Sequence, residues 1–147
     1  MRYLILLCLL YLLLDSKIAF GICSDLWEKE MTSELSMQRS MPFSCSDQIG
    51  KAAQYHANDM CQRNFFSHVS PEGYTAKDRL YRISQINAYY WGETLYRTTN
   101  AESKAIVAAW MGHNGYKQVI QDPKLNYVGF GWTLCNGWYL IVANYTN

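Results

Sequence analysis

The sequence carries little charge and no cluster of basic residues. Charged side chains occupy 17% of its 147 positions, with 13 lysines and arginines against 12 aspartates and glutamates. Nucleic acids and anionic membranes both bind through concentrated positive charge, so neither is an expected partner. The sequence also lacks a C-x-x-C pair, the usual spacing of zinc-binding cysteines, and a nucleophile elbow of the hydrolase type.

The sequence has only one long apolar run, which lies near its start. Residues 3–14 form a run of 12 apolar residues, which is shorter than the roughly 20 that a transmembrane helix needs. Arg2 precedes the run, Asp15 and Lys17 end it, and small residues at positions 19 and 21 form a cleavage site. We therefore predict a signal peptide over residues 1–21 and a secreted, extracellular protein. Asp15 and Lys17 oppose the alternative of an uncleaved anchor.

Cleavage there would leave a mature chain with one domain and no membrane span. Removing Arg2, Lys17 and Asp15 leaves 11 basic and 11 acidic residues, so the mature chain has no net charge with its histidines neutral. Residues 22–43 have weak periodicity and are expected to form an N-terminal arm, either a short helix or an extended segment. Residues 44–147 are expected to form the domain, which is large enough for a core.

Four of the five cysteines remain after the signal peptide is removed. Cys23, Cys45, Cys61 and Cys135 are an even number in an oxidising compartment, which predicts two disulfides. If Cys45 and Cys61 stand at the two ends of one helix, about 24 Å separates them, and a disulfide needs Cα atoms within about 7 Å. Cys23 therefore pairs with Cys45 or with Cys61, and Cys135 takes the other.

Residues 52–80 hold two of the three histidines and pass from one helical pattern through a turn into a second. Ser44, with Asp47 three residues later, has the spacing of a capping box and predicts the start of the first helix. Small and apolar residues then recur at helical intervals on a stripe that includes His56. A packed, hydrogen-bonded core histidine is the favoured interpretation of His56, over a role in a site.

His68 is the more informative histidine. It lies between an aromatic pair, residues 65–66, and a turn at residues 70–73. Pro71 suits the second position of that turn and Gly73 the last. A titratable ring held beside a rigid turn and a bulky anchor is a candidate site.

The next elements are short. Thr75 is expected to cap a helix over residues 76–83. Residues 87–94 are aromatic and predict a strand or extended segment, which places Glu93 at its end. A lone glutamate at a strand end is usually solvated surface, so its importance depends on what lies opposite.

A further helix is predicted over residues 101–111, where Thr99 and Glu102 repeat the capping-box spacing. His113 follows that helix. It either continues the helix's apolar stripe or sits in the turn after it, and the sequence leaves both open. Residues 116–121 favour one more helical piece, which an Asp-Pro pair ends.

The C-terminal part predicts a β-hairpin. Residues 136–137 are Asn-Gly, the preferred pair for a two-residue turn. The resulting register pairs Cys135 with Trp138, Trp132 with Ile141 and Phe130 with Ala143.

The two hairpin strands also indicate the layers around them. Gly129 and Gly131 share one face of the first strand and leave room for another element. The return strand is apolar on both faces, which is typical of a strand covered on both sides. The pattern predicts an α/β/α sandwich with a central antiparallel sheet. Asn144 begins an Asn-x-Thr sequon and is a candidate glycosylation site.

These motifs, taken in order, resemble the CAP superfamily of cysteine-rich secretory, venom-antigen and plant pathogenesis-related proteins. The resemblance is carried by AAQYHANDMCQRNFFSHVSPEG, then WGET, AAWM, the VGFGW hairpin strand and the final ANY. It covers residues 44–145, and the short loops look most like the bacterial-type SCP domain. It implies an α/β/α sandwich, in agreement with the strand pattern.

The family's cleft is lined by two histidines and two acidic residues, and the resemblance carries over position by position. His68 matches the first histidine, and Glu93 matches one acid, with Thr94 where asparagine is usual. His113 stands where members with a second acid have it, and Tyr116 stands where the second histidine falls in the SCP type. Two of the four positions therefore match and two depart.

Three functions follow from this altered cleft. The first, which the resemblance favours, is non-enzymatic binding of a lipid or sterol, a partner protein or a microbial surface. The second is a metal-assisted hydrolase, with zinc held by His68, Glu93 and His113 and Tyr116 beside it. The third is a structural extracellular domain whose disulfides provide durability and whose cleft is vestigial. The alternative to the zinc site is a degenerate cleft held by His–Glu hydrogen bonds and aromatic packing, with no metal.

Overall fold

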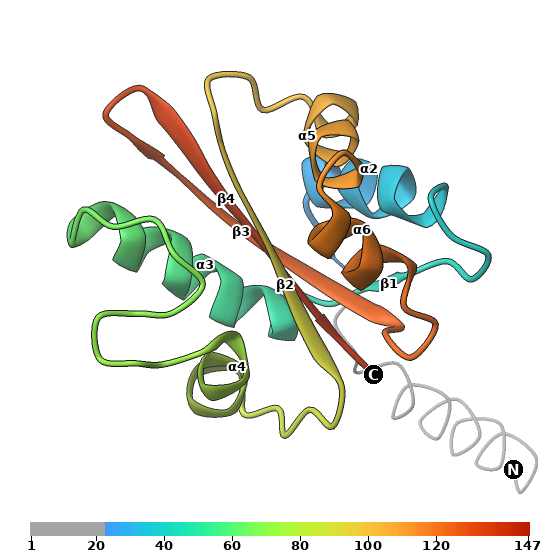
Figure 1. Cartoon of the computed structure of the whole chain (residues 1–147), viewed down its shortest axis with the longest axis horizontal. Helices are drawn as coiled ribbons and strands as arrows, with labels where there is room; N and C mark the ends of the chain where they lie inside the picture. Colours follow the sequence, from blue (N-terminus) through green and yellow to red (C-terminus); the bar gives the residue numbers. More distant parts are fainter. Residues whose placement is uncertain (1–22) are drawn as a thin grey trace, which may run out of the picture.

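A four-stranded sheet forms the middle layer of the protein (Figure 1). The computed structural model describes residues 23–147, so the predicted signal peptide lies outside the described residues. The strands are β1 (Ser44–Cys45), β2 (Trp91–Thr98), β3 (Tyr127–Cys135) and β4 (Trp138–Thr146), in the order β1-β3-β4-β2. β4 pairs antiparallel with both β2 and β3, and only the two-residue β1 is parallel, to β3.

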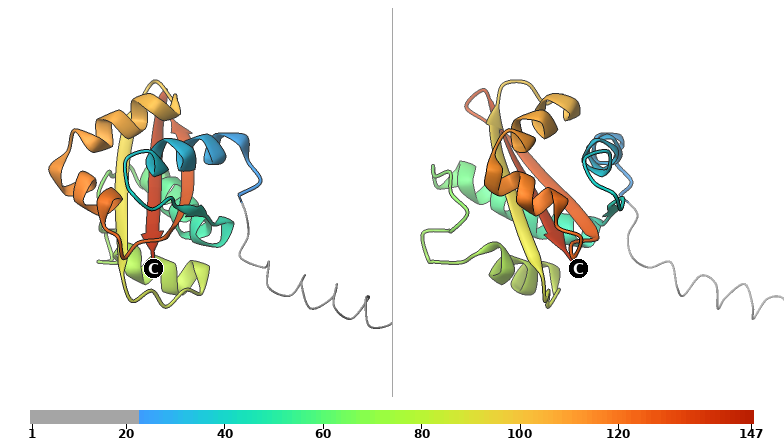
Figure 2. Two further views of the ribbon diagram at one scale, coloured as in Figure 1. Left: turned by 90° about the vertical axis from the view of Figure 1, so that its right-hand side faces the viewer. Right: turned by 45° about the vertical axis from the view of Figure 1, so that its right-hand side comes forward.

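Helices cover both faces of this sheet. One face carries α3 (Asp47–Gln62) and α4 (Ala76–Ser84), and the other carries α2 (Leu26–Ser36), α5 (Ser103–Met111) and α6 (Asn114–Gln121) (Figures 1 and 2). The predicted α/β/α sandwich is therefore confirmed. None of the helices in residues 23–147 has the length and apolarity that a bilayer crossing requires.

The hairpin has the predicted register. Asn136 and Gly137 form the turn with φ of 51° and 82°, the left-handed region that a two-residue hairpin turn uses. The pairs are Cys135 with Trp138, Trp132 with Ile141 and Phe130 with Ala143, as expected.

The two glycines of β3 let α3 pack closely on the sheet. A Cβ added to Gly129 would lie 2.2 Å from the backbone nitrogen of Gly50, and one on Gly131 would lie 2.1 Å from that of Gln54. Both separations are far inside van der Waals contact, so a side chain at either position would force α3 away from the sheet.

The start of α3 differs from the prediction. Ser44 does not cap it, because the backbone of Ser44 donates to the Asn126 carbonyl (2.9 Å) and extends β1 along β3. The cap is Ser46, whose side chain accepts from the backbone N–H of Ile49. Pairing with β3 therefore outweighs a capping spacing that was only local.

The end of β2 and the start of α5 also differ from the prediction. β2 begins at Trp91 and runs to Thr98, four residues past the predicted end, because it pairs with β4 along its whole length. Helix α5 has Glu102 at its N-cap and no side-chain capping bond, so the predicted capping box is absent there. The box at Thr75 is present, with reciprocal bonds to Asp78.

The segment predicted as an N-terminal arm contains α2. Asp25 caps this helix, and its residues Met31 and Leu35 are fully buried. They belong to the same apolar cluster as Trp110 of α5 and Phe130 of β3. Residues 26–36 therefore complete one face of the sandwich.

Two disulfides join the predicted cysteines. Cys23 pairs with Cys45 and Cys61 with Cys135, at Cα separations of 5.4 and 5.7 Å. This is one of the two pairings that the sequence left open. The first bond ties the start of α2 to β1, and the second ties the end of α3 to the tip of the hairpin.

Candidate functional site

The four predicted cleft residues meet at β2, the strand at one edge of the sheet. Glu93 lies on β2, His68 comes from the loop after α3 on one face, and His113 and Tyr116 come from the start of α6 on the other. Together they line a cavity of about 380 Å³ that Trp91 and Val119 also border. The cleft is thus a groove across β2 between the two helical layers.

Glu93 is the buried floor of the cleft. Its residue is 6% exposed, and both carboxylate oxygens are engaged. Oε1 lies 2.9 Å from His68 Nδ1, and Oε2 accepts from Arg79 Nη2 at 2.7 Å. Asn144, in the orientation that satisfies both its neighbours, donates to Oε2 (2.9 Å) and accepts from the backbone N–H of Ala53 (3.2 Å). The carboxylate is therefore a fixed structural anion.

Arg79 is the residue that sequence reasoning missed. It is 2% exposed, and besides Glu93 it donates to the carbonyls of Tyr74 (2.9 Å) and His68 (3.0 Å). Its guanidinium thus holds the His68 loop against the edge strand. In the sequence, Arg79 does not differ from Lys77 and Arg82, the other basic residues of the predicted helix after Thr75.

His68 connects the buried anion to the open side of the cleft. Its side chain is 47% exposed, and its Nε2 lies 3.0 Å from the Tyr116 hydroxyl. Burial is the main cause that raises the pKa of Tyr116. The Tyr116 hydroxyl and the Glu93 carboxylate thus hydrogen-bond to the two nitrogens of the same imidazole ring.

His113 lies in the turn before α6, which decides between the two placements that the sequence left open. It is the N-cap residue, and its Nδ1 accepts from the backbone N–H of Tyr116 at 3.3 Å. Its ring packs on that of Tyr116 with centroids 4.3 Å apart. His113 therefore supports the tyrosine that reaches His68.

His56 is fully buried, as the helical stripe predicted. Its Nε2 lies 2.8 Å from the Ser67 carbonyl, and desolvation lowers its pKa. A neutral His56 thus fixes the chain next to His68 from the α3 side.

The side chains do not fit the hypothesised three-ligand zinc site in this arrangement. Within residues 23–147, the ligating atoms of His68, Glu93 and His113 do not all approach within 4.8 Å of one another. Both His68 nitrogens have protein partners, and the Arg79 cation is paired with Glu93. A zinc ion would have to displace Tyr116 and sit next to a buried positive charge.

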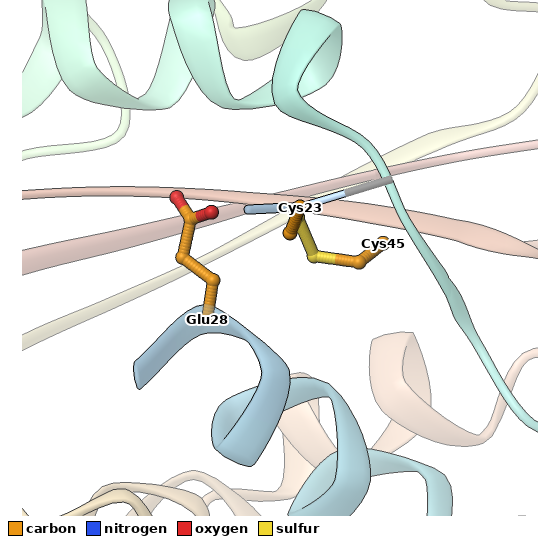
Figure 3. A group of neighbouring side chains, drawn as sticks. All are labelled: Cys23, Glu28 and Cys45. Atoms are coloured by element: carbon orange, nitrogen blue, oxygen red, sulfur yellow. A yellow bond between two sulfur atoms is a disulfide. The ribbon is translucent and has the colours of Figure 1, made fainter. Parts of the chain in front are cut away.

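A different group of side chains has metal-ligand spacing, and Figure 3 shows it. The sulfurs of Cys23 and Cys45 and a carboxylate oxygen of Glu28 lie within 4.8 Å of one another. The two sulfurs are bonded to each other as a disulfide, and metals bind thiolates. Burial, then the charges of Asp47 and Asp25, raise the pKa of Glu28 to about 7. The group is thus a disulfide beside a carboxyl that readily holds a proton.

Asn144, the predicted glycosylation site, is fully buried. Its side chain bridges Glu93 and the backbone of α3, because the end of β4 is covered on both faces. The folded domain therefore does not expose this amide to a glycosyltransferase.

A three-layer sandwich whose edge strand holds a histidine–carboxylate cleft is the arrangement that the CAP resemblance implied. The model of the cysteine-rich secretory protein family (CAP) matches residues 36–145 of the chain. The protein belongs to the cysteine-rich secretory protein family.

Similar proteins include bacterial members. The chain is 26% identical over 104 residues to the uncharacterized protein YkwD of Bacillus subtilis (strain 168), covering 70% of this chain and 40% of that protein. An extracellular SCP-domain protein of Bacillus anthracis str. Ames matches with a TM-score of 0.68 and 22% identity, over 82% of this chain and 40% of that one. The chain thus spans 40% of the length of each of these two proteins.

Two further solved structures share the fold. An outer surface protein of Borrelia burgdorferi matches with a TM-score of 0.73 and 17% identity, over 86% of this chain and 96% of that one. The structure of NaASP2 with Zn²⁺ matches with a TM-score of 0.53 and 12% identity, over 81% and 76%. At these identities the likeness concerns the fold alone.

Proposed function

We propose that this protein is a secreted, non-enzymatic binding module that holds an amphipathic extracellular ligand, a lipid or sterol, in the cleft across β2. The observation that carries this proposal is that the cleft combines apolar and polar side chains. Trp91 (41% exposed) and Val119 offer apolar surface, and His68 and Tyr116 offer polar groups. A ligand with an apolar body and one polar group matches both.

The hydrogen bonding inside the cleft opposes the alternative, a hydrolase. Both nitrogens of His68 and both oxygens of Glu93 already have partners. The hydroxyl that meets His68 belongs to a tyrosine, and the Thr75 hydroxyl donates to Asp78 at 2.7 Å. A general base needs an activated nucleophile within reach, and this lining does not supply one.

Secretion is part of the proposal. The predicted signal peptide, the two disulfides and the extracellular and outer-surface relatives support it. Disulfides persist in oxidising compartments.

Binding of a fluorescent sterol and of a fluorescent fatty acid to the purified protein tests the proposal. Trp91→Ala removes the largest apolar side chain of the cleft and is expected to weaken binding at least fivefold. Tyr116→Phe removes only one hydroxyl and is expected to weaken it about threefold or more. Trp138→Ala is the matched control, because Trp138 is 39% exposed but lies at the hairpin turn, outside the cleft. It should change nothing.

Two results would overturn the proposal. One is a protein that binds neither probe, or binds them equally well after Trp91→Ala and Tyr116→Phe. The other is hydrolysis of ester or peptide substrates that His68→Ala abolishes, which would favour the hydrolase instead.

A further inference from the structure

Another cavity lies on the α2 and α5 side of the sheet and shares no lining residue with the cleft. It has a volume of about 250 Å³, and its lining comes from the start of α2, the loop before α5 and strands β3 and β4. The residues that line it are Asp25, Trp27, Ala101, Trp132, Tyr139 and Ile141. Three of these six are aromatic, and they come from three separate elements.

The aromatic walls are held in fixed orientations. The indole N–H of Trp27 donates to the Ala101 carbonyl at 2.9 Å, and its ring meets Phe130 edge-on at 5.9 Å. Trp132 and Tyr139 are diagonal neighbours on the hairpin, with ring centroids 5.8 Å apart and planes inclined by 58°. Trp132 remains 46% exposed. The rings of Trp132, Tyr139 and Trp27 thus form the walls of a cavity that a small ligand can enter.

The charge at this cavity is negative. Asp25 is exposed and lines the cavity, and both hydrogen bonds by which it caps α2 use its Oδ1. Of the described residues that line the cavity, none is basic. Aromatic faces also carry negative quadrupole potential. The cavity therefore matches a cation, and its apolar floor at Ile141 disfavours one that must keep its water.

We propose that this cavity is an aromatic cage for a quaternary ammonium group, of the kind carried by choline. Such a group has a full positive charge but no N–H donor, so it enters an aromatic site without leaving hydrogen bonds unmade. Tryptophan and tyrosine faces attract it through cation–π interactions, and the Asp25 carboxylate adds a direct charge interaction. A lysine ammonium has three N–H donors, and of the side chains that line the cavity only Asp25 and Tyr139 carry an oxygen to accept them.

Titration with choline, followed by calorimetry and by the indole N–H resonances in NMR, tests the cage. Wild type is expected to bind choline in the millimolar range or tighter, with shifts for Trp27 and Trp132. The buried Trp110, whose indole donates to the Leu95 carbonyl, should not shift. The neutral isostere 3,3-dimethylbutan-1-ol has the same shape without the charge and should bind at least fivefold more weakly.

Three variants complete the test. Asp25→Asn keeps a good N-cap but removes the charge, so it leaves α2 intact and should weaken choline binding about threefold or more. Trp132→Ala removes an exposed wall and should weaken it at least fivefold. Trp138→Ala, an exposed tryptophan elsewhere on the hairpin, should leave it unchanged.

Phosphatidylcholine vesicles distinguish the two sources of the group. Co-sedimentation that Asp25→Asn weakens assigns the ligand to a lipid headgroup, and choline binding without co-sedimentation assigns it to a free cation. The proposal is overturned if choline does not bind, if the neutral alcohol binds equally well, or if Asp25→Asn and Trp132→Ala both leave the affinity unchanged. These outcomes are independent of sterol or fatty-acid binding in the cleft.

Discussion

Replacement of Arg79 by methionine tests how the cleft is built. Arg79 and Glu93 form an ion pair at 2.7 Å in which both side chains are 2% exposed. Methionine preserves much of the side-chain volume but leaves the Glu93 carboxylate buried without its cation. Removal of one partner from a buried pair costs about 3–5 kcal/mol, so we expect Arg79→Met to lower the free energy of unfolding by about 4 kcal/mol.

A double-mutant cycle separates the lost charge pair from lost packing. In Arg79→Met/Glu93→Gln neither charge remains, and the glutamine can still accept from His68. The remaining loss comes from the Tyr74 and His68 carbonyls, which no longer have their Arg79 donor, at about 1 kcal/mol each. The double variant is therefore expected to lose about 2 kcal/mol, less than Arg79→Met alone.

Urea unfolding at pH 7, followed by tryptophan fluorescence and far-UV circular dichroism, measures these differences. Arg82→Met is the matched control. Arg82 lies one turn further along α4, is exposed and stacks over the Tyr74 ring at 4.3 Å, so its loss should stay below about 1 kcal/mol. The reasoning is refuted if Arg79→Met behaves like Arg82→Met, or if the double variant loses the sum of both single losses.

Two more predictions concern protonation and metal. The pKa of Glu28 is raised to about 7 in the folded protein, from an ordinary 4.5, so folding takes up a proton between these values. The associated stability is present below about pH 4.5 and is lost as the pH rises through about 7. Because Glu28 is half-exposed, we expect Glu28→Gln to gain only about 1 kcal/mol over wild type at pH 8 and nothing at pH 4, measured by urea unfolding; an equal effect at both values would contradict this. Tyr116→His restores the family's second histidine opposite His68 Nε2, and the shorter ring leaves space for zinc bonded at about 2 Å to each. Calorimetry should detect zinc binding in Tyr116→His that His68→Ala abolishes and that wild type lacks; zinc binding by wild type at His68 would contradict it.

Local chemistry in the sequence determined much of the fold. The Asn136-Gly137 pair specified the hairpin turn, since only that turn type requires two residues with positive φ. Thr75 and Asp78 specified the start of α4 through their reciprocal capping bonds. The strand that is apolar on both faces predicted helices on both sides. Each of these signals acts within a few residues, so no distant partner was needed to interpret it.

The tertiary structure decided the element boundaries and side-chain roles that depend on residues distant in the sequence. Ser44 became a strand residue because β3 lies beside it, and β2 was extended by β4. The sequence placed His68 and Glu93 in one cleft through its resemblance to a family. Arg79 could be identified only from the fold, because a buried cation is recognisable only once its anion is placed opposite it.

The two cleft positions that depart from the family pattern also show which features the sequence determined and which the tertiary structure decided. The sequence showed that His113 and Tyr116 replace the expected residues, but both roles follow from the α6 turn. There His113 caps the helix and packs on Tyr116, whose hydroxyl then meets His68. The cavity of Trp27, Trp132 and Tyr139 likewise has no local signal, because its walls are 105 and 7 residues apart in the chain. Side chains that converge from separate elements form a site only after the sheet and its helices have packed.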